Sequence, residues 1–203
     1  LKQRNQLLRH GRMDEDLLRT WTAELIPLCE HITRFRRQYL SSLAGHVSNA
    51  VSAFEGLGKV SLEYYCGWDE ERTLADVYTA DHGRDIGTKT TNHGAHRADI
   101  RIKVDGRAAA EHLSRGQIKL LVYALKLAQA GYYRENTGES CLFLLDDLPA
   151  ELDYQHRRQV ISYLNDLGCQ YFITGVDKKD FEGLVKTVPH QMFHMEHGVV
   201  LVD

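Results

Sequence analysis

The stretch Leu113-Ser114-Arg115-Gly116-Gln117 opens a helical pattern that extends to about Arg134. The apolar run Cys141-Leu142-Phe143-Leu144-Leu145 follows it and ends in Asp146-Asp147, and Glu151-Leu152-Asp153 comes shortly afterwards. A continuous apolar strand between helices is typical of a parallel sheet with both faces covered. We therefore predict an α/β layer fold for this part of the chain.

The rest of the carboxyl-terminal half continues the alternation of helix and strand. A helix is expected over 154–167, a short strand over 170–174 and a helix near 178–186. Two closing strands are expected on either side of the turn at His197-Gly198. The predicted α/β lobe accordingly covers residues 93–203.

The amino-terminal half has mainly helical periodicity. A short amphipathic segment stops near Gly11, and apolar residues then recur at steps of three and four from Leu17 to Phe54. Pro27 interrupts this pattern, and we expect a kink or a break there because proline lacks the amide donor and clashes with the preceding turn.

Strands are expected at Val60–Cys66, more weakly at Leu74–Tyr78, and from Ala98 to the turn at Asp105-Gly106. The polar, glycine-rich stretch 81–94 is typical of a loop or a short connecting hairpin. Residues 1–92 are therefore predicted to form a helical domain with a small β component.

The composition is that of an ordinary globular protein. The chain has 203 residues, 43% of them hydrophobic and 26% charged, with a net charge of −3. No global basic field favours nucleic acid, so any DNA contact must come from a local patch such as Arg34, Arg36 and Arg37. A solvated helix face is the other interpretation of these arginines.

No signal peptide is evident, and no apolar stretch approaches the roughly twenty residues that span a bilayer. The four cysteines are too far apart in sequence for a zinc motif and favour a reducing compartment. We expect a cytoplasmic protein with no membrane partner.

The residues at the start of the helix and at the end of the strand have chemistry suited to a phosphate ligand. Ser114 places a hydroxyl and the first free helix amides where they can face an anion, and Gly116 lets the backbone approach closely. Asp146 lies at the carboxyl end of a strand, where α/β sheets place ligands, and its oxygens suit Mg²⁺. Asp147 can orient or deprotonate a water.

A structural interpretation of the same residues is also open. Ser114-x-x-Gln117 is a capping box, which by itself accounts for the serine, and a strand that ends in two acids is common. The order and separation of all the motifs together favour the functional interpretation.

In that order, the motifs resemble the ATPase heads of the SMC type, and most closely the RecF family. The resemblance includes His93-Gly94-Ala95-His96-Arg97-Ala98-Asp99, which is similar to that family's HGPHR-D stretch, and it covers nearly the whole chain. It implies the carboxyl-terminal part of an ABC/SMC-type P-loop ATPase head joined to a helical second domain.

The resemblance also implies roles for single residues. Ser114, Arg115, Gly116 and Gln117 match the signature motif, which in such heads contacts the γ-phosphate of ATP held by the other subunit. Asp153 matches the D-loop, which crosses the dimer interface.

The paired acids match the Walker B motif of the same family. Asp146 corresponds to the magnesium-binding aspartate, and Asp147 stands at the position of the catalytic acid, which is glutamate in many relatives. The shorter side chain is consistent with slow hydrolysis. Thr174 lies about where many such ATPases have a switch histidine, and no histidine follows it.

For the complete protein, the resemblance implies an ATP-dependent homodimer with weak ATP hydrolysis and a need for Mg²⁺. It implies a clamp that binds double-stranded DNA at gaps and helps load RecA in recombinational repair and the SOS response, with RecR and RecO as partners.

The chain lacks G-x-x-x-x-G-K-[ST], and its nearest stretch, Gly56-Leu57-Gly58-Lys59-Val60-Ser61, has the wrong spacing. We therefore expect a fragment without the Walker A lobe that is inactive alone.

Two other interpretations remain. One is the head of another SMC-like ATPase, with residues 17–54 as the base of a shortened coiled coil. The other is a non-catalytic protein-interaction module that keeps the fold without the chemistry.

Overall fold

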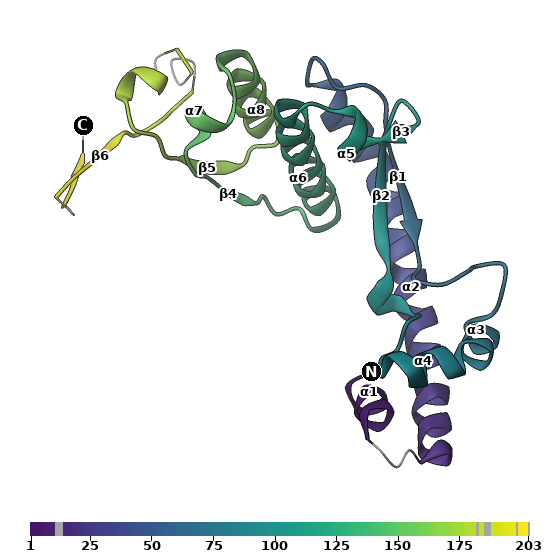
Figure 1. Ribbon diagram of the computed structural model, residues 1–203. Helices are drawn as coiled ribbons and strands as arrows, with labels where there is room; N and C mark the ends of the chain where they lie inside the picture. The colour runs from purple at the N-terminus through teal and green to yellow at the C-terminus, as the bar shows by residue number, and fades with distance from the viewer. Residues whose placement is uncertain (11–13, 182, 185–187, 198, 203) are drawn as a thin grey trace. The chain divides into compact units, whose positions relative to one another are not determined.

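The computed structural model describes residues 1–10, 14–181, 183–184, 188–197 and 199–202, which form two compact units (Figure 1). Unit 1 comprises Leu1–Gly45 and Lys59–His112, and unit 2 comprises His46–Gly58 and Leu113–Asp203. The chain passes from one unit to the other after residues 45, 58 and 112, whereas the predicted boundary lies between residues 92 and 93. The reason is that a strand over Asp99–Val104 is hydrogen-bonded along its length to one over Val60–Tyr65.

Unit 1 combines helices with an antiparallel sheet of order β1-β2-β3. Its strands are β1 (Val60–Tyr65), β2 (Asp99–Val104) and β3 (Arg107–Ala108). Its helical elements are α1 (Lys2–Arg9), most of α2 (Glu15–Ser52), α3 (Leu74–Ala80), α4 (His82–Thr88), the 3-10 helix η1 (Ala95–Arg97) and α5 (Ala109–His112). The strands predicted at 60–66 and 98–104 and the turn at Asp105-Gly106 are confirmed.

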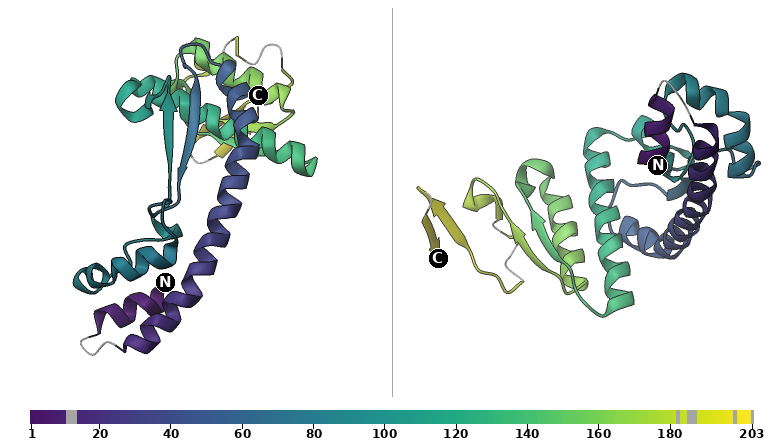
Figure 2. Two further views of the ribbon diagram at one scale, coloured as in Figure 1. Left: turned by 90° about the vertical axis from the view of Figure 1, so that its right-hand side faces the viewer. Right: turned by 90° about the horizontal axis from the view of Figure 1, so that it is seen from below.

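The long helix α2 is continuous (Figure 2), and Pro27 lies inside it. The predicted break is therefore wrong. Proline removes one hydrogen bond of the helix, but the helix keeps its buried face on both sides, with Leu18 before Pro27 and Cys29 and Leu43 after it.

Two further predictions in unit 1 are wrong. The weak strand expected at 74–78 is the helix α3, because the Thr73 hydroxyl accepts a hydrogen bond from the Asp76 amide at 3.1 Å and caps its first turn. The expected loop at 81–94 contains the helix α4, whose only buried residue is Asp85. A helix without an apolar stripe gives no periodic signal, which explains the error.

Two glycines close the core of unit 1. The Gly94 amide donates to the Gly67 carbonyl at 3.2 Å, and both residues have positive φ, 124° and 98°. A Cβ atom on Gly67 would lie 2.1 Å from the Gly94 oxygen, so only glycine fits. The stretch that begins at His93 is thereby held against a cluster of Cys29, Cys66, Trp68, Leu74, Val77, Tyr78 and Ala95.

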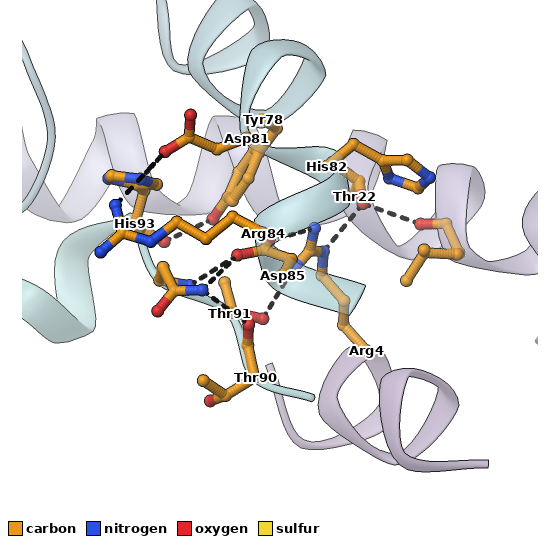
Figure 3. A network of polar contacts seen from close by, with 12 residues as sticks. Arg4, Thr22, Tyr78, Asp81, His82, Arg84, Asp85, Thr90, Thr91 and His93 are labelled. Carbon is orange, nitrogen blue, oxygen red and sulfur yellow. Dashed lines mark hydrogen bonds and ion pairs between the residues drawn. The ribbon is translucent and has the colours of Figure 1, made fainter. Parts of the chain in front are cut away.

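A buried arginine fastens α1 to the rest of unit 1 (Figure 3). Arg4 is 1% exposed, and its guanidinium lies 2.8 Å from the carboxylate of Asp85, which is fully buried. Arg4 also donates to the hydroxyls of Thr22 at 2.9 Å and Thr91 at 2.6 Å. Asp85 in turn accepts from the amide and the side chain of Asn92. Segments far apart in sequence are thus joined around one compensated charge pair.

Unit 2 is an α/β arrangement. Its helical elements are α6 (Arg115–Thr137), α7 (Leu148–Glu151), α8 (Tyr154–Asp166) and the 3-10 helix η2 (Lys178–Phe181). Strands β4 (Leu142–Leu145) and β5 (Gln170–Ile173) pair in parallel, and β6 (Phe193–Glu196) and β7 (Val199–Val202) form an antiparallel hairpin. The predicted elements are confirmed with one exception: the short 3-10 helix η2 stands where a helix was expected near 178–186. Residues 182 and 185–187 of that segment lie outside the described residues, and so does Gly198 of the final turn.

Only one face of the β4–β5 pair is covered within the described chain. Leu142, Leu144 and Phe172 are exposed, Leu144 by 75%, whereas Leu145 on the other face is buried. The expectation of a sheet buried on both faces is therefore not met by these residues. Among the described residues, no helix is long and apolar enough to cross a membrane.

The buried ion pair predicts a large stability effect in unit 1. Asp85→Asn keeps the shape of the side chain but leaves the Arg4 charge buried without a counter-charge, which we expect to cost about 3–5 kcal/mol. Glu70→Gln is the matched control, because Glu70 pairs with Arg37 at the surface, where such pairs contribute about 1 kcal/mol or less. Urea denaturation measures both, and equal losses would contradict a structural role for the buried pair.

Candidate functional site

The start of α6 is a complete capping box on the surface of unit 2. The Ser114 hydroxyl accepts from the Gln117 amide at 3.3 Å, and the Gln117 side chain accepts from the Ser114 amide at 3.0 Å. Ser114, Arg115 and Gly116 are exposed, and a Cβ atom on Gly116 would meet nothing within 4 Å. This helix start is therefore capped on both sides, with open space at Gly116.

Gln117 has a second structural contact that the sequence did not indicate. Its side-chain nitrogen donates to the Gly56 carbonyl at 2.9 Å, in the segment 53–58 that follows α2. Both ends of the carboxamide are thus used in holding the helix start. Within this geometry Gln117 positions Ser114 through one end of its carboxamide and holds the loop with the other.

The same segment holds the start of α8. The Gln155 side chain donates to the Glu55 carboxylate at 2.6 Å, and the His156 ring lies 3.4 Å from the Glu55 carbonyl oxygen. The beginnings of α6 and α8 therefore meet on neighbouring residues of one loop. Segment 53–58 thus brings together the proposed signature motif and D-loop. Its two glycines are typical of a turn and do not by themselves indicate this role.

Asp153 is the N-cap of α8. Its carboxylate accepts from the His156 amide at 2.9 Å and lies 2.8 Å from the His156 ring nitrogen. The hydrogen bond from the His156 amide is the largest cause that lowers the pKa of Asp153 below its ordinary value. Asp153 is therefore fixed as a carboxylate, with 63% of its side chain exposed.

Asp146 and Asp147 are joined through Thr174. The Thr174 hydroxyl donates to the Asp146 carboxylate at 2.6 Å and accepts from the Asp147 amide at 2.8 Å. Thr174 follows β5 and Asp146 follows β4, so the parallel pairing of the two strands sets this contact. Asp147 has a left-handed backbone with φ 46° and ψ 41°, which turns the chain from β4 into α7.

The acids form an oxygen-rich edge suited to a cation that keeps part of its hydration shell. No group of three or more His, Cys, Asp or Glu within the described part of the chain is arranged to hold a metal. Asp146 is exposed, so its carboxylate is accessible to a ligand. This donor set fits Mg²⁺ held by one carboxylate together with water and phosphate oxygens.

A further ion pair links the two parts of this surface. Lys119 of α6 lies 2.7 Å from Glu151 at the end of α7. The helix that begins at Ser114 is thus tied to the short helix that follows the paired acids.

The three arginines considered for DNA contact lie in unit 1 and already have partners. Arg36 donates to the Ala95 carbonyl at 2.7 Å, Arg34 lies 2.7 Å from the His31 ring, and Arg37 pairs with Glu70. Arg36 therefore has a structural role at the stretch that follows His93. A phosphate would compete with each of these contacts.

Known proteins are similar to this chain in sequence and fold. The family model described as the RecF/RecN/SMC N terminal domain matches residues 3–200. The chain belongs to this family. It is 42% identical to "DNA replication and repair protein RecF" of Chromohalobacter salexigens over 204 residues, which is 100% of this chain and 56% of that protein. The protein of the same name from Pseudomonas paraeruginosa is 42% identical over 98% of this chain and 54% of its own length.

Solved structures agree with the fold. The recombination mediator protein RecF-ATPrS in RecFOR pathway superposes with a TM-score of 0.80 and 29% identity, over 100% of this chain and 55% of that one. An SMC head bound to the C-winged helix domain of ScpA has a TM-score of 0.51 at 14% identity, over 89% of this chain and 49% of that one, which shows the fold alone. The predicted α/β fold of the SMC-head type is confirmed, and the chain spans about half the length of the curated relatives it matches.

The Thr174 bridge predicts a measurable change in local order. Thr174→Val removes the hydroxyl but keeps the shape, so both hydrogen bonds to the acids are lost at a cost of about 1–2 kcal/mol. We expect faster amide exchange at Asp147, measured by hydrogen–deuterium exchange. Thr174→Ser is the control and should behave like the unaltered chain; an unchanged exchange rate in the valine variant would disprove the bridge.

The double role of Gln117 can be tested with a near-isosteric change. Gln117→Glu keeps an acceptor for the Ser114 amide but removes the donor to the Gly56 carbonyl. We expect amide exchange to rise in residues 53–58 while the Ser114 amide stays protected, because only one of the two contacts is lost. Equal exposure of both segments would contradict the separation of the two roles.

Proposed function

We propose that this chain supplies the signature motif, the Walker B acids and the D-loop of a RecF-type ATPase that acts in DNA replication and repair. The observation that carries the proposal is the presence, in one compact unit, of an open capped helix start at Ser114 and of paired acids at the carboxyl end of a parallel strand. Membership of the RecF/RecN/SMC family supports it.

In this proposal the start of α6 meets the terminal phosphate of ATP held by a second subunit. The Ser114 hydroxyl and the first amides of α6 offer donors to an anion, and they need no rearrangement because the capping box already fixes them. Arg115 adds an exposed positive charge beside them. Gln117 acts as the brace of this donor set, and Asp153 fixes the neighbouring helix start at the same interface.

The paired acids act on the nucleotide of their own subunit. Asp146 would hold Mg²⁺, which neutralises developing phosphate charge when bound. Thr174 orients the Asp146 carboxylate through its hydroxyl and fixes the Asp147 amide. Asp147 would orient the attacking water, and its short side chain suits slow hydrolysis and a switch between two states.

For the complete protein, we propose an ATP-dependent homodimer that binds double-stranded DNA at gaps and helps load RecA, with RecR and RecO as partners, in the cytoplasm. ATP joins the two subunits and hydrolysis releases them, so the DNA-binding state is the ATP-bound dimer. The arginines Arg34, Arg36 and Arg37 stay candidates for DNA contact, provided that a phosphate displaces their present partners.

The decisive experiment uses a protein of the full length of the RecF relatives that contains this chain. Ser114→Arg places a bulky cation in the space where the phosphate of the other subunit would lie. We expect ATP-dependent dimerisation, measured by light scattering with ATP and Mg²⁺, to fall at least about tenfold, which corresponds to about 1.4 kcal/mol.

Ser162→Arg is the matched control, because Ser162 is an exposed serine on α8 away from the helix start. It should dimerise like the unaltered protein. If the Ser114 variant still dimerises on ATP and binds duplex DNA normally, the proposed role of α6 is wrong. If the unaltered protein does not dimerise on ATP at all, the chain is better explained as a non-catalytic interaction module.

A further inference from the structure

Two of the four cysteines lie side by side at the start of the parallel strand pair. The register sets Leu142 opposite Gln170, and Cys141 and Cys169 are the residues that directly precede this first matched pair of the two strands. They are 28 positions apart in sequence, and only the pairing of β4 with β5 brings them together.

Cys141 is among the groups that shift the pKa of the Cys169 thiol, which agrees with the places of the two residues just before the paired strands β4 and β5. The Cys169 sulfur also lies 3.9 Å from the Leu167 carbonyl oxygen. Both cysteines are free and half-buried, so small reagents have access to them.

The backbone geometry suits a disulfide bond. Neighbouring strands lie about 4.8 Å apart. A disulfide joins Cα atoms that are about 4.4–6.8 Å apart. Residues at matched positions of a parallel pair point to the same face of the sheet, so the two Cβ atoms also point the same way.

We propose that Cys141 and Cys169 form a reversible dithiol–disulfide pair that reacts with small-molecule disulfides. The thiolate of one cysteine attacks a sulfur of oxidised glutathione, forms a mixed disulfide and releases one glutathione thiolate. The thiolate of the other cysteine then attacks the protein sulfur of the mixed disulfide and releases the second glutathione. Two electrons pass from the protein sulfurs to the reagent, and each protein thiol loses one proton.

The other two cysteines provide an internal comparison. Cys29 is 3% exposed and Cys66 is fully buried, and both belong to the core of unit 1. A reagent in solution cannot reach them without unfolding that unit. The proposed reactivity therefore belongs to one pair of the four.

The pair lies at the opposite end of the two strands from the acids. β4 begins after Cys141 and ends before Asp146, and β5 begins after Cys169 and ends before Thr174. A disulfide at this end would lock the register on which the contact between Thr174 and Asp146 depends. The reactivity itself does not depend on any nucleotide function.

Burial raises the pKa of the Cys169 thiol, and this effect exceeds the opposing effects of the Cys141 amide and of Arg134. At neutral pH a smaller fraction of Cys169 is therefore thiolate than for an ordinary cysteine. Because the thiolate is the nucleophile, disulfide formation should become faster as the pH rises above neutrality.

The test treats the folded chain with oxidised glutathione and measures the intact mass and the free thiols. We expect a mass loss of about 2 Da and a fall from four free thiols to two, and digestion should yield a peptide that joins Cys141 to Cys169. Dithiothreitol should restore all four. The oxidised chain should also melt several degrees higher, because the bond closes a loop in the unfolded chain.

Two single variants sharpen the result. Cys141→Ser and Cys169→Ser each leave one member of the pair, so each should stop at a glutathione adduct and not lose about 2 Da. Four free thiols after treatment of the unaltered folded chain, persistent adducts on it, or a link to Cys29 or Cys66 would each overturn the proposal.

Discussion

The parallel register between β4 and β5 is the constraint on which the rest of unit 2 depends. Leu145 stands opposite Ile173, so the chain leaves both strands at the same edge, and the Thr174 hydroxyl reaches Asp146 at 2.6 Å. A slip of one residue would turn Thr174 to the other face of the sheet. The same register places Cys141 beside Cys169 at the opposite edge.

A second constraint is the loop of residues 53–58, which links the starts of α6 and α8. Gly56 accepts from Gln117, while Glu55 accepts from Gln155 and lies against His156. Each contact is a hydrogen bond of modest net energy, but several of them converge on one short segment. The segment follows directly from α2, so the long helix and the two helix starts are connected through the backbone.

Unit 1 depends on a different kind of interaction. The pair of Arg4 and Asp85 is buried, and further hydrogen bonds join Arg4 to Thr22 and Thr91 and Asp85 to Asn92. Such a pair contributes little net stability compared with apolar packing, but it allows few alternative arrangements. It fixes α1 and α4 against the segment that contains Gly94, and Arg36 holds the same segment from α2. The stretch from His93 to Arg97 is thus part of the framework of unit 1.

The sequence by itself determined the α/β character of residues 113–203, the strands of unit 1, the capping box at Ser114 and the resemblance to the RecF family. These features are local: apolar periodicity, a strand of continuous apolar residues and a cap whose two partners lie three positions apart. The sequence did not reveal α3 and α4, which are too short or too polar to show an apolar stripe, or that α2 continues through Pro27. Only the tertiary structure decided that Thr174 joins the acids, that Glu55 and Gly56 join two helix starts, and that Cys141 and Cys169 precede two paired strands. The hydrogen bonds among these contacts span between 27 and 101 positions of the chain. No local pattern encodes such contacts, because they depend on how strands pair and helices pack.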